Sequence, residues 1–234
     1  MNVLWFSAGV SSAIVAYLCQ DEIDVVLYQH IEDQHPDTLR FLHDVEKLIG
    51  KSITIQQSPY RTVDNACRSK NCIRIPRKPP TCSLLLKREE RQKWEYENEG
   101  NHVYYWGLDY TERERAERFE RSMPNVDHRF PLIERGLTKQ DVHGMAVSLG
   151  LRRPAMYDMG YHNNNCIGCV AGGMGYWNKI RRDFPEVFAS RAKMERDIGH
   201  SCINGVYLDE LSPDAGRDDP PITTECGVYC LLNI

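Results

Sequence analysis

The sequence has no long apolar run and little excess of charge of either sign. Its 234 residues carry 29 lysines and arginines against 33 aspartates and glutamates, a formal net charge of −4. No apolar segment approaches the ~20 residues that a membrane-spanning helix needs. The N-terminus has no basic region before an apolar stretch, so it does not resemble a signal peptide. We therefore expect a cytoplasmic protein with no membrane partner, and no uniformly basic surface for nucleic acid.

Internal repeats and low-complexity tracts are also missing. Hydrophobic residues make up 41% of the chain, which is enough to bury the core of a globular domain. Cysteine, in contrast, is frequent, with nine in the chain. Because thiols stay reduced in the cytosol, we expect these cysteines to be metal ligands or reactive groups rather than disulfides.

Strand and helix patterns alternate in the first half of the chain. Helices are predicted over 13–18 and 37–50, and strands over 2–6, 24–31, 52–56 and 102–106. Such alternation is typical of a parallel sheet flanked by helices, the α/β class.

The second half of the chain has a different composition. A helical segment from 138 to 150 is followed by a stretch rich in Tyr, Asn, Cys and Gly over 157–176, and then by a basic helix predicted over 177–198. We expect a nucleotide-binding domain over 1–150. A mostly helical and irregular C-terminal extension over 151–234 would pack on that domain.

A short loop of small residues lies between the first predicted strand and the first predicted helix. Small side chains let a backbone approach a phosphate, while hydroxyls and a helix N-terminus donate hydrogen bonds to it. A plain strand-to-helix turn without a ligand is the alternative. The loop is not a Walker motif, since no Gly-Lys-Ser/Thr follows. The candidate phosphate-binding residues are Ser7, Ala8, Gly9, Ser11 and Ser12.

Cys166 and Cys169 form a CxxC motif. Two thiolates at this spacing can bind one metal ion or one iron–sulfur cluster. A structural zinc site is an alternative, with His162 and Cys202 as further ligands. A thioredoxin-type dithiol is less consistent with the sequence, because that motif opens a helix directly after the first strand of its sheet.

The loop over 7–12 resembles the PP-loop, Ser-Gly-Gly-x-Asp-Ser, of N-type ATP pyrophosphatases and sulfonucleotide reductases. Ser7, Gly9 and Ser12 match, whereas Ala8 replaces a glycine and Ser11 replaces the aspartate. Further segments follow in the family's order. Pro36-Asp37-Thr38 resembles its Pro-Glu-Thr, residues 82–87 its Cys-x-x-x-Leu-Lys, and residues 107–115 its Gly-x-x-x-x-Glu-x-x-Arg.

Over residues 7–115, the chain thus resembles the phosphoadenosine phosphosulfate (PAPS) reductase family of the PP-loop superfamily. The resemblance implies a Rossmann-like PP-loop fold and an adenine nucleotide, either ATP or PAPS/APS. Lys87 and Arg115 would neutralise the nucleotide anion, and Gly107 and Glu112 belong to the same binding motif.

The resemblance also implies a 4Fe–4S cluster. Cluster-bearing members of the family use an upstream cysteine together with a CxxC, and here Cys82 precedes Cys166 by 84 residues. Cys82, Cys166 and Cys169 are the expected ligands. The fourth ligand stays open: the iron has no protein ligand, or it binds Cys202, Cys226 or Cys230.

Residues 224–229 near the C-terminus resemble the family's Thr-Glu-Cys-Gly-Ile/Leu-His. In sulfonucleotide reductases this cysteine attacks the sulfate sulfur, so Cys226 is the expected catalytic thiol, alongside Lys87. Tyr229 stands where the family has histidine, and Cys230 is an added neighbour. A thiolate is the nucleophile that such chemistry requires.

Three functions remain open at the level of sequence. The first is reduction of an activated sulfate, the second ATP-dependent thiolation of a nucleic acid through the cluster, and the third non-catalytic binding of zinc or a cluster. The expected partners are a small-molecule nucleotide and a thiol electron donor or sulfur donor. Nucleic acid and a second copy of the chain, in a homodimer, are further candidates.

Overall fold

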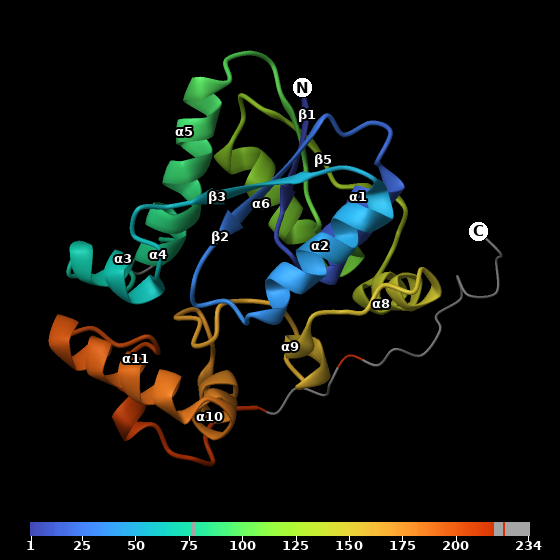
Figure 1. The fold of residues 1–234 in the computed structure, drawn as a ribbon. Helices are drawn as coiled ribbons and strands as arrows, with labels where there is room; N and C mark the ends of the chain where they lie inside the picture. The colour runs from blue at the N-terminus through green and yellow to red at the C-terminus, as the bar shows by residue number, and fades with distance from the viewer. Residues whose placement is uncertain (76–77, 218–221, 223–234) are drawn as a thin grey trace.

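A five-stranded sheet forms the centre of the molecule (Figure 1). The structure is a computed structural model that describes residues 1–75, 78–217 and 222. The strand order is β3-β2-β1-β4-β5, and every neighbouring pair is parallel. This arrangement confirms the α/β class predicted from the alternating pattern. The strands are β1 (Asn2–Phe6), β2 (Val25–His30), β3 (Ile53–Gln57), β4 (Val103–Tyr105) and β5 (Asp127–Arg129).

Helices cover both faces of this sheet, because side chains alternate between the faces along each strand. In β1, Leu4 and Phe6 join the main core, and Trp5 packs on the other face against Trp94. The main-core face is covered by α1 (Val10–Leu18), α2 (Asp37–Ile49), α7 (Pro131–Glu134) and α8 (Lys139–Ser148). The opposite face carries α5 (Glu89–Glu97) and α6 (Arg113–Ser122).

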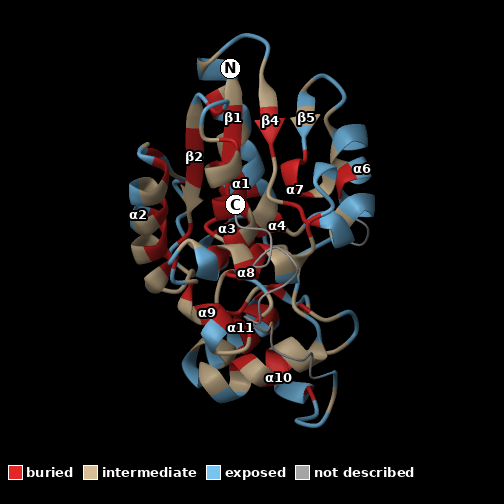
Figure 2. Ribbon diagram, turned by 90° about the vertical axis from the view of Figure 1, so that its right-hand side faces the viewer, coloured by how far each residue is buried: buried red, intermediate tan, exposed pale blue. Residues whose placement is uncertain are grey.

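A second hydrophobic cluster lies beyond the carboxyl ends of the strands, in the lower half of Figure 2. It joins residues from 63–86 with residues from 156–211, so two distant parts of the chain share one core. Its helices include α3 (Val63–Ser69), α4 (Thr81–Ser83), α9 (Ala155–Asp158), α10 (Met174–Asp183) and α11 (Pro185–Ile198). Short π- and 3₁₀-helical turns are η1 (Leu84–Arg88), η2 (Tyr110–Glu112) and η3 (Leu208–Glu210). The domain boundary expected near residue 150 stays a prediction.

The basic helix predicted over 177–198 is wrong as a single element. Two helices replace it, and they meet at Phe184, whose φ of −139° and ψ of 64° are not helical. Pro185 causes the break, because proline disfavours a helical residue before it and suits the first position of a new helix. Helix α5 was not predicted, and among its nine residues only Trp94 is buried. No helix in the described part of the chain is long and apolar enough to cross a membrane.

His143 of α8 makes stability depend on pH. Its side chain is 1% exposed, and neither ring nitrogen has a hydrogen-bond partner among the described residues. Burial lowers the pKa of His143 from 6.5 to about 4. Between these values the unfolded chain binds a proton that the folded chain does not. The free energy of unfolding therefore falls as pH drops from 6.5 to 4, by at most about 3 kcal/mol.

We expect His143→Leu to remove this contribution while keeping the site apolar. Urea unfolding of both proteins at several pH values measures the effect. The wild type should lose more stability than the variant between pH 6.5 and 4, and equal losses would contradict the assignment.

Candidate functional site

A large cavity opens where the strand order reverses, between β1 and β4. In open parallel sheets, ligands bind at this point, outside the carboxyl ends of the strands. The cavity has a volume of about 620 Å³. Ser7 and Gly9 follow β1 at its wall, and Gly107 follows β4. These are the segments in which the sequence predicts nucleotide-binding residues.

The loop over 7–12 is closed by its own hydrogen bonds. The Ser12 hydroxyl donates to the Gly9 carbonyl over 2.9 Å and accepts the Ser7 amide over 3.2 Å. Ser12 is 1% exposed, so its hydroxyl stabilises the loop from the protein interior. Ala8 is fully buried and has a φ of +56°, a left-handed conformation that costs a non-glycine residue about 1–2 kcal/mol. Of the five residues predicted to bind phosphate, Ser7, Gly9 and Ser11 line the cavity, and Ala8 and Ser12 do not.

Gly107 lies against this loop so closely that no side chain fits. A Cβ atom at this position would stand 2.7 Å from both the Cα and the backbone nitrogen of Ser12. Its role is to let the end of β4 approach the phosphate loop. The sequence motif identified Gly107, and the structure supplies this steric reason for the glycine.

Positive charge gathers on the cavity wall. Lys87 and Arg115, both predicted, line the cavity, and Glu112 accepts a hydrogen bond from Arg115 over 2.6 Å. Lys139 was missed by the sequence reasoning. It lies at the N-terminal end of α8, donates to Asn163 over 2.9 Å, and has its pKa lowered by burial. Arg88 and Arg91 also line the cavity. A cavity with this lining suits a polyanion.

Asn164 is a second residue that sequence reasoning missed. Its amide nitrogen donates to the Ala8 carbonyl over 2.8 Å and to the Thr38 hydroxyl over 3.1 Å. Its amide oxygen is buried and has no partner among the described residues, although Asn164 lines the cavity. A buried unpartnered acceptor is costly, and a ligand hydroxyl or amine would satisfy it. The only sequence feature that points to Asn164 is its position two residues before the CxxC motif.

A π-helical turn connects the cavity to the cysteines. Cys82 lies in α4, and Lys87 lies five residues later in η1; this helical run continues into α5. Cys82 is 9% exposed within the second hydrophobic cluster, whereas Lys87 lines the cavity. Burial raises the pKa values of Cys82, Cys166 and Cys169, and the positive charge of Lys87, which lies near all three predicted cluster ligands, offsets part of this rise. Single π-turns of this kind are frequent at functional sites.

Five cysteines gather at this end of the molecule: Cys67, Cys82, Cys166, Cys169 and Cys202. The thiols of Cys67 and Cys82 hydrogen-bond to each other, which raises the pKa of Cys82 together with burial. Burial also raises the pKa of Cys166, to about 12, and those of Cys169 and Cys202. None of the seven described cysteines is in a disulfide.

The CxxC loop is fixed by contacts to three elements. The Ile167 amide donates to the Asp33 carbonyl over 2.8 Å, just beyond β2. The Tyr176 hydroxyl accepts the Cys169 amide over 2.8 Å and donates to the Cys166 carbonyl over 3.1 Å. Arg191 of α11 donates to the Gly168 carbonyl over 3.3 Å. These contacts fix the backbone of the CxxC loop.

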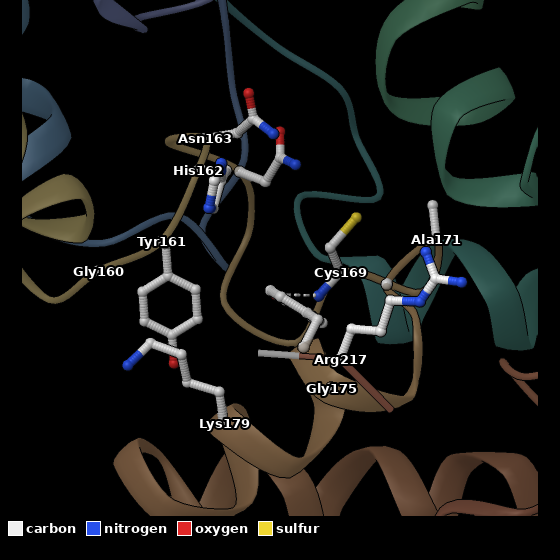
Figure 3. A pocket seen from close by; sticks show the side chains of 12 residues that line it. Gly160, Tyr161, His162, Asn163, Cys169, Ala171, Gly175, Lys179 and Arg217 are labelled. Atoms are coloured by element: carbon white, nitrogen blue, oxygen red, sulfur yellow. Dashed lines mark hydrogen bonds between the residues drawn. The ribbon is translucent and has the colours of Figure 1, made fainter. Parts of the chain in front are cut away.

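The two cysteines of the motif line different cavities. Cys166 lines the large cavity. Cys169 lines a smaller one of about 270 Å³, in which Tyr161 and Lys179 come from the other side (Figure 3). The CxxC loop is therefore a wall between the two. Among residues 1–75, 78–217 and 222, no three His, Cys, Asp or Glu side chains are arranged to hold a single metal ion. Cys226 and Cys230 lie outside the described residues.

The comparisons with known proteins agree with this architecture. No protein-family model and no curated protein matches the sequence. Among solved structures, the chain is similar to phosphoadenylyl-sulfate (PAPS) reductase from Candida auris in complex with phosphate. The TM-score is 0.51 and the identity 12%, over 69% of this chain and 79% of that chain. The chain has a PAPS-reductase-like fold. That result confirms the fold implied by the PP-loop resemblance.

In this PAPS-reductase-like fold, several basic residues outside the cavity have structural partners. Arg68 pairs with Asp64 and Asp197, and its exposed side chain is typical of a surface ion pair. Arg181 donates to two backbone carbonyls near η3. These contacts favour a structural role for both arginines over a role in nucleic-acid binding.

We expect Gly107→Ala to distort the phosphate loop, since the contacting atoms of Ser12 are backbone. Overpacking of this kind costs about 1–3 kcal/mol. Gly173→Ser is the control, because a Cβ atom there meets nothing within 4 Å, its φ is −81°, and serine is a favoured residue at this N-cap position of α10. Urea unfolding should show a clear loss for Gly107→Ala and no loss for the control. Equal stabilities of the two variants would contradict the steric argument.

Proposed function

We propose that the protein binds an adenine nucleotide carrying an activated sulfate and reduces that sulfate to sulfite. One observation carries the proposal: Ser7 of the phosphate loop, the Lys87 ammonium and the Cys166 thiol all line the same cavity. A nucleotide whose phosphates meet the loop would have its anionic end beside a group of thiols. Anion recognition and sulfur chemistry would then take place in one chamber.

Binding rests on the loop and the cations. The Ser7 and Ser11 hydroxyls can donate to phosphate oxygens. The first backbone amides of α1 can do the same, because the N-cap residue, Gly9, has no side chain to cap them. Lys87, Arg115 and Lys139 would neutralise the remaining charge. The lowered pKa of Lys139 shows that its ammonium is held at a desolvation cost, which a bound anion would offset.

A 4Fe–4S cluster is part of this proposal, because the cysteine motifs resemble those of the family's cluster-bearing members. Thiolates are the ligands of such clusters, and the five gathered cysteines provide more than enough of them. Their raised pKa values mean that several thiolates do not coexist there without a neutralising cation. Cys82, Cys166 and Cys169 would hold the cluster, whose positively charged iron–sulfur core would neutralise their thiolates and supply electron-transfer capacity beside the nucleotide.

The reactive thiol in this proposal is Cys226, because residues 224–229 resemble the C-terminal motif of sulfonucleotide reductases. Its thiolate attacks the sulfate sulfur, the bond from that sulfur to the bridging phosphate oxygen breaks, and the adenosine phosphate leaves with the electron pair. The resulting S-sulfocysteine is then reduced by an external dithiol, which becomes a disulfide as sulfite leaves. Lys87 and Arg115 stabilise the charge on the departing phosphate.

A second function, ATP-dependent thiolation of a nucleic acid, is favoured by one observation. Cys166 opens directly onto the nucleotide cavity, so sulfur held near it could reach an activated substrate there. In this case ATP would adenylate the acceptor and release pyrophosphate. Ser11 replaces the aspartate of the family's PP-loop, and the loss of this carboxylate argues against ATP-dependent thiolation.

Cys226→Ser is the direct test of the reaction. Anaerobically purified protein, supplied with a dithiol and with PAPS or APS, should release sulfite, and the variant should lose at least about 100-fold of this rate because a hydroxyl is a far weaker nucleophile. Cys72→Ser, at a partly exposed position in another loop, is the control and should keep the rate.

An undiminished rate in Cys226→Ser would contradict the nucleophile assignment. Pyrophosphate release from ATP that requires added RNA or DNA, without sulfite release, would instead support thiolation. If neither sulfite nor pyrophosphate is released with PAPS, APS or ATP, the result would support a non-catalytic binding function.

Lys139→Met tests the binding half independently of redox chemistry. Loss of a charged donor to phosphate costs about 1.5–3 kcal/mol, so the dissociation constant for the nucleotide should rise by roughly 10-fold or more. Lys47→Met is the control, because its side chain on α2 is 80% exposed. Titration calorimetry measures both. Unchanged affinity in Lys139→Met would remove Lys139 from the site.

A further inference from the structure

Two aromatic side chains line the large cavity without a role in the proposed reaction. Trp106 follows β4, and Phe119 lies on α6. Their ring centroids are 4.8 Å apart, and the rings are nearly perpendicular, at 77°. Both residues pack against a small hydrophobic cluster, which accounts for the buried part of each ring. Both are nevertheless only partly buried, and the part that lines the cavity needs a separate explanation.

Helix α6 extends this aromatic pair into an apolar wall. The Met123 amide, at the end of α6, donates to the Phe119 carbonyl over 3.0 Å, so the two residues lie one helical turn apart. Residues four apart share one face of a helix, and the Met123 side chain also lines the cavity. A phosphate group has no use for such a wall. This part of the cavity therefore suits a different, apolar part of a ligand.

Hydrogen bonds hold the indole ring of Trp106 in one plane. Its Nε1–H donates to Nδ1 of His128 on β5 over 3.0 Å. The other ring nitrogen of His128, Nε2, lies 3.0 Å from the Met123 carbonyl. Because a carbonyl only accepts, Nε2 carries the proton and Nδ1 is the acceptor for the indole. The ring is thus oriented before any ligand binds, so little side-chain freedom is lost on binding.

The indole is carried by the residue next to the one that contacts the phosphate loop. Gly107 follows Trp106 directly, and a Cβ atom on Gly107 would stand 2.7 Å from the Ser12 backbone. Consecutive Cα atoms are only about 3.8 Å apart. In a nucleotide, the flat base and the 5′-phosphate are separated by a single ribose. One nucleotide can therefore place its phosphate at the loop and its base at Trp106, within the same cavity of about 620 Å³.

Arg115 links the aromatic pair to the anionic part of the site. Its guanidinium carbon lies 5.7 Å from the centroid of the Phe119 ring, and its Nη1 donates to Glu112 over 2.6 Å. The sequence motif assigns Arg115 to the nucleotide anion, and its side chain lines the same cavity. A cation beside an aromatic wall is the arrangement expected where the charged and the flat parts of one ligand meet.

We propose that Trp106 and Phe119 form the nucleobase subsite, in which the base stacks on the Trp106 indole beside the wall of Phe119 and Met123. This inference rests on the proposed function for the presence of a nucleotide. Every base has a π-face, so stacking supplies affinity and little choice among bases. Trp106 and Phe119 are then binding residues, and the chemistry at the sulfate does not involve them.

The variant Trp106→Leu tests the subsite, because it removes the π-face and keeps an apolar side chain. ADP, an unreactive isostere of APS, and inorganic pyrophosphate, which has no base, are titrated calorimetrically into the full-length wild type and the variant. The dissociation constant for ADP should rise roughly 5- to 150-fold, and that for pyrophosphate should not change. Tyr96→Leu on α5 is the control, because Tyr96 is 81% exposed, and it should alter neither constant.

The outcomes separate this inference from the proposed function. An unchanged dissociation constant for ADP in Trp106→Leu would overturn the inference alone. An equal loss of affinity for ADP and pyrophosphate would also overturn it, since the substitution would then act through the phosphate loop. Wild-type protein that binds neither ADP nor PAPS would overturn both the subsite and the proposed function.

A second measurement uses Trp106→Phe, in case Trp106→Leu does not fold. Phenylalanine keeps a π-face, so this variant should retain most of the affinity for ADP. A base stacked on an indole quenches its fluorescence, so ADP should quench the wild type. The variant, which keeps the other three of the four tryptophans, should lose most of this quenching. Full quenching in Trp106→Phe at saturating ADP would overturn the inference.

Discussion

The buried ion pair between Arg191 and Asp33 is the contact on which the rest of the site depends. Asp33 lies just beyond β2 at the carboxyl edge of the sheet, and Arg191 lies on α11 in the second hydrophobic cluster. The carboxylate also accepts the Val63 amide at the start of α3, and the guanidinium also reaches the CxxC loop. Removing one partner of such a pair leaves an uncompensated buried charge, at a cost of about 3–5 kcal/mol. The pair therefore joins the sheet, α3, α11 and the cysteines into one unit.

This junction gives the cavity its mixed character. On the sheet side, the loop after β1 and the close approach of Gly107 form a surface suited to phosphate. On the other side, Cys166 forms part of the wall, with the remaining thiols behind it. Burial raises the pKa of the Cys166 thiol, and Lys87 on the π-helical turn, which lines the same cavity, offsets part of this rise. Neither half of the site is complete without the contacts that hold the C-terminal segment against the sheet.

The sequence allowed prediction of the features that are local in the chain. The phosphate loop, the parallel strands and the CxxC follow from residue type and spacing over a few positions. The contributions of Lys139 and Asn164 did not follow, because each acts through neighbours that are distant in the sequence. The same holds for Cys67, whose contact with Cys82 depends on how α3 packs against α4. Helices α10 and α11 were predicted as one because their basic residues mask the break at Pro185.

The central claim is that the nucleotide and the cysteine group share one chamber. An anaerobic crystal structure of the protein with PAPS, measured with X-rays at the iron absorption edge, tests it most directly. The account predicts an anomalous iron peak beside Cys82, Cys166 and Cys169, and nucleotide phosphate against residues 7–12. Iron bound elsewhere, or a nucleotide outside the cavity lined by Ser7 and Cys166, would contradict it.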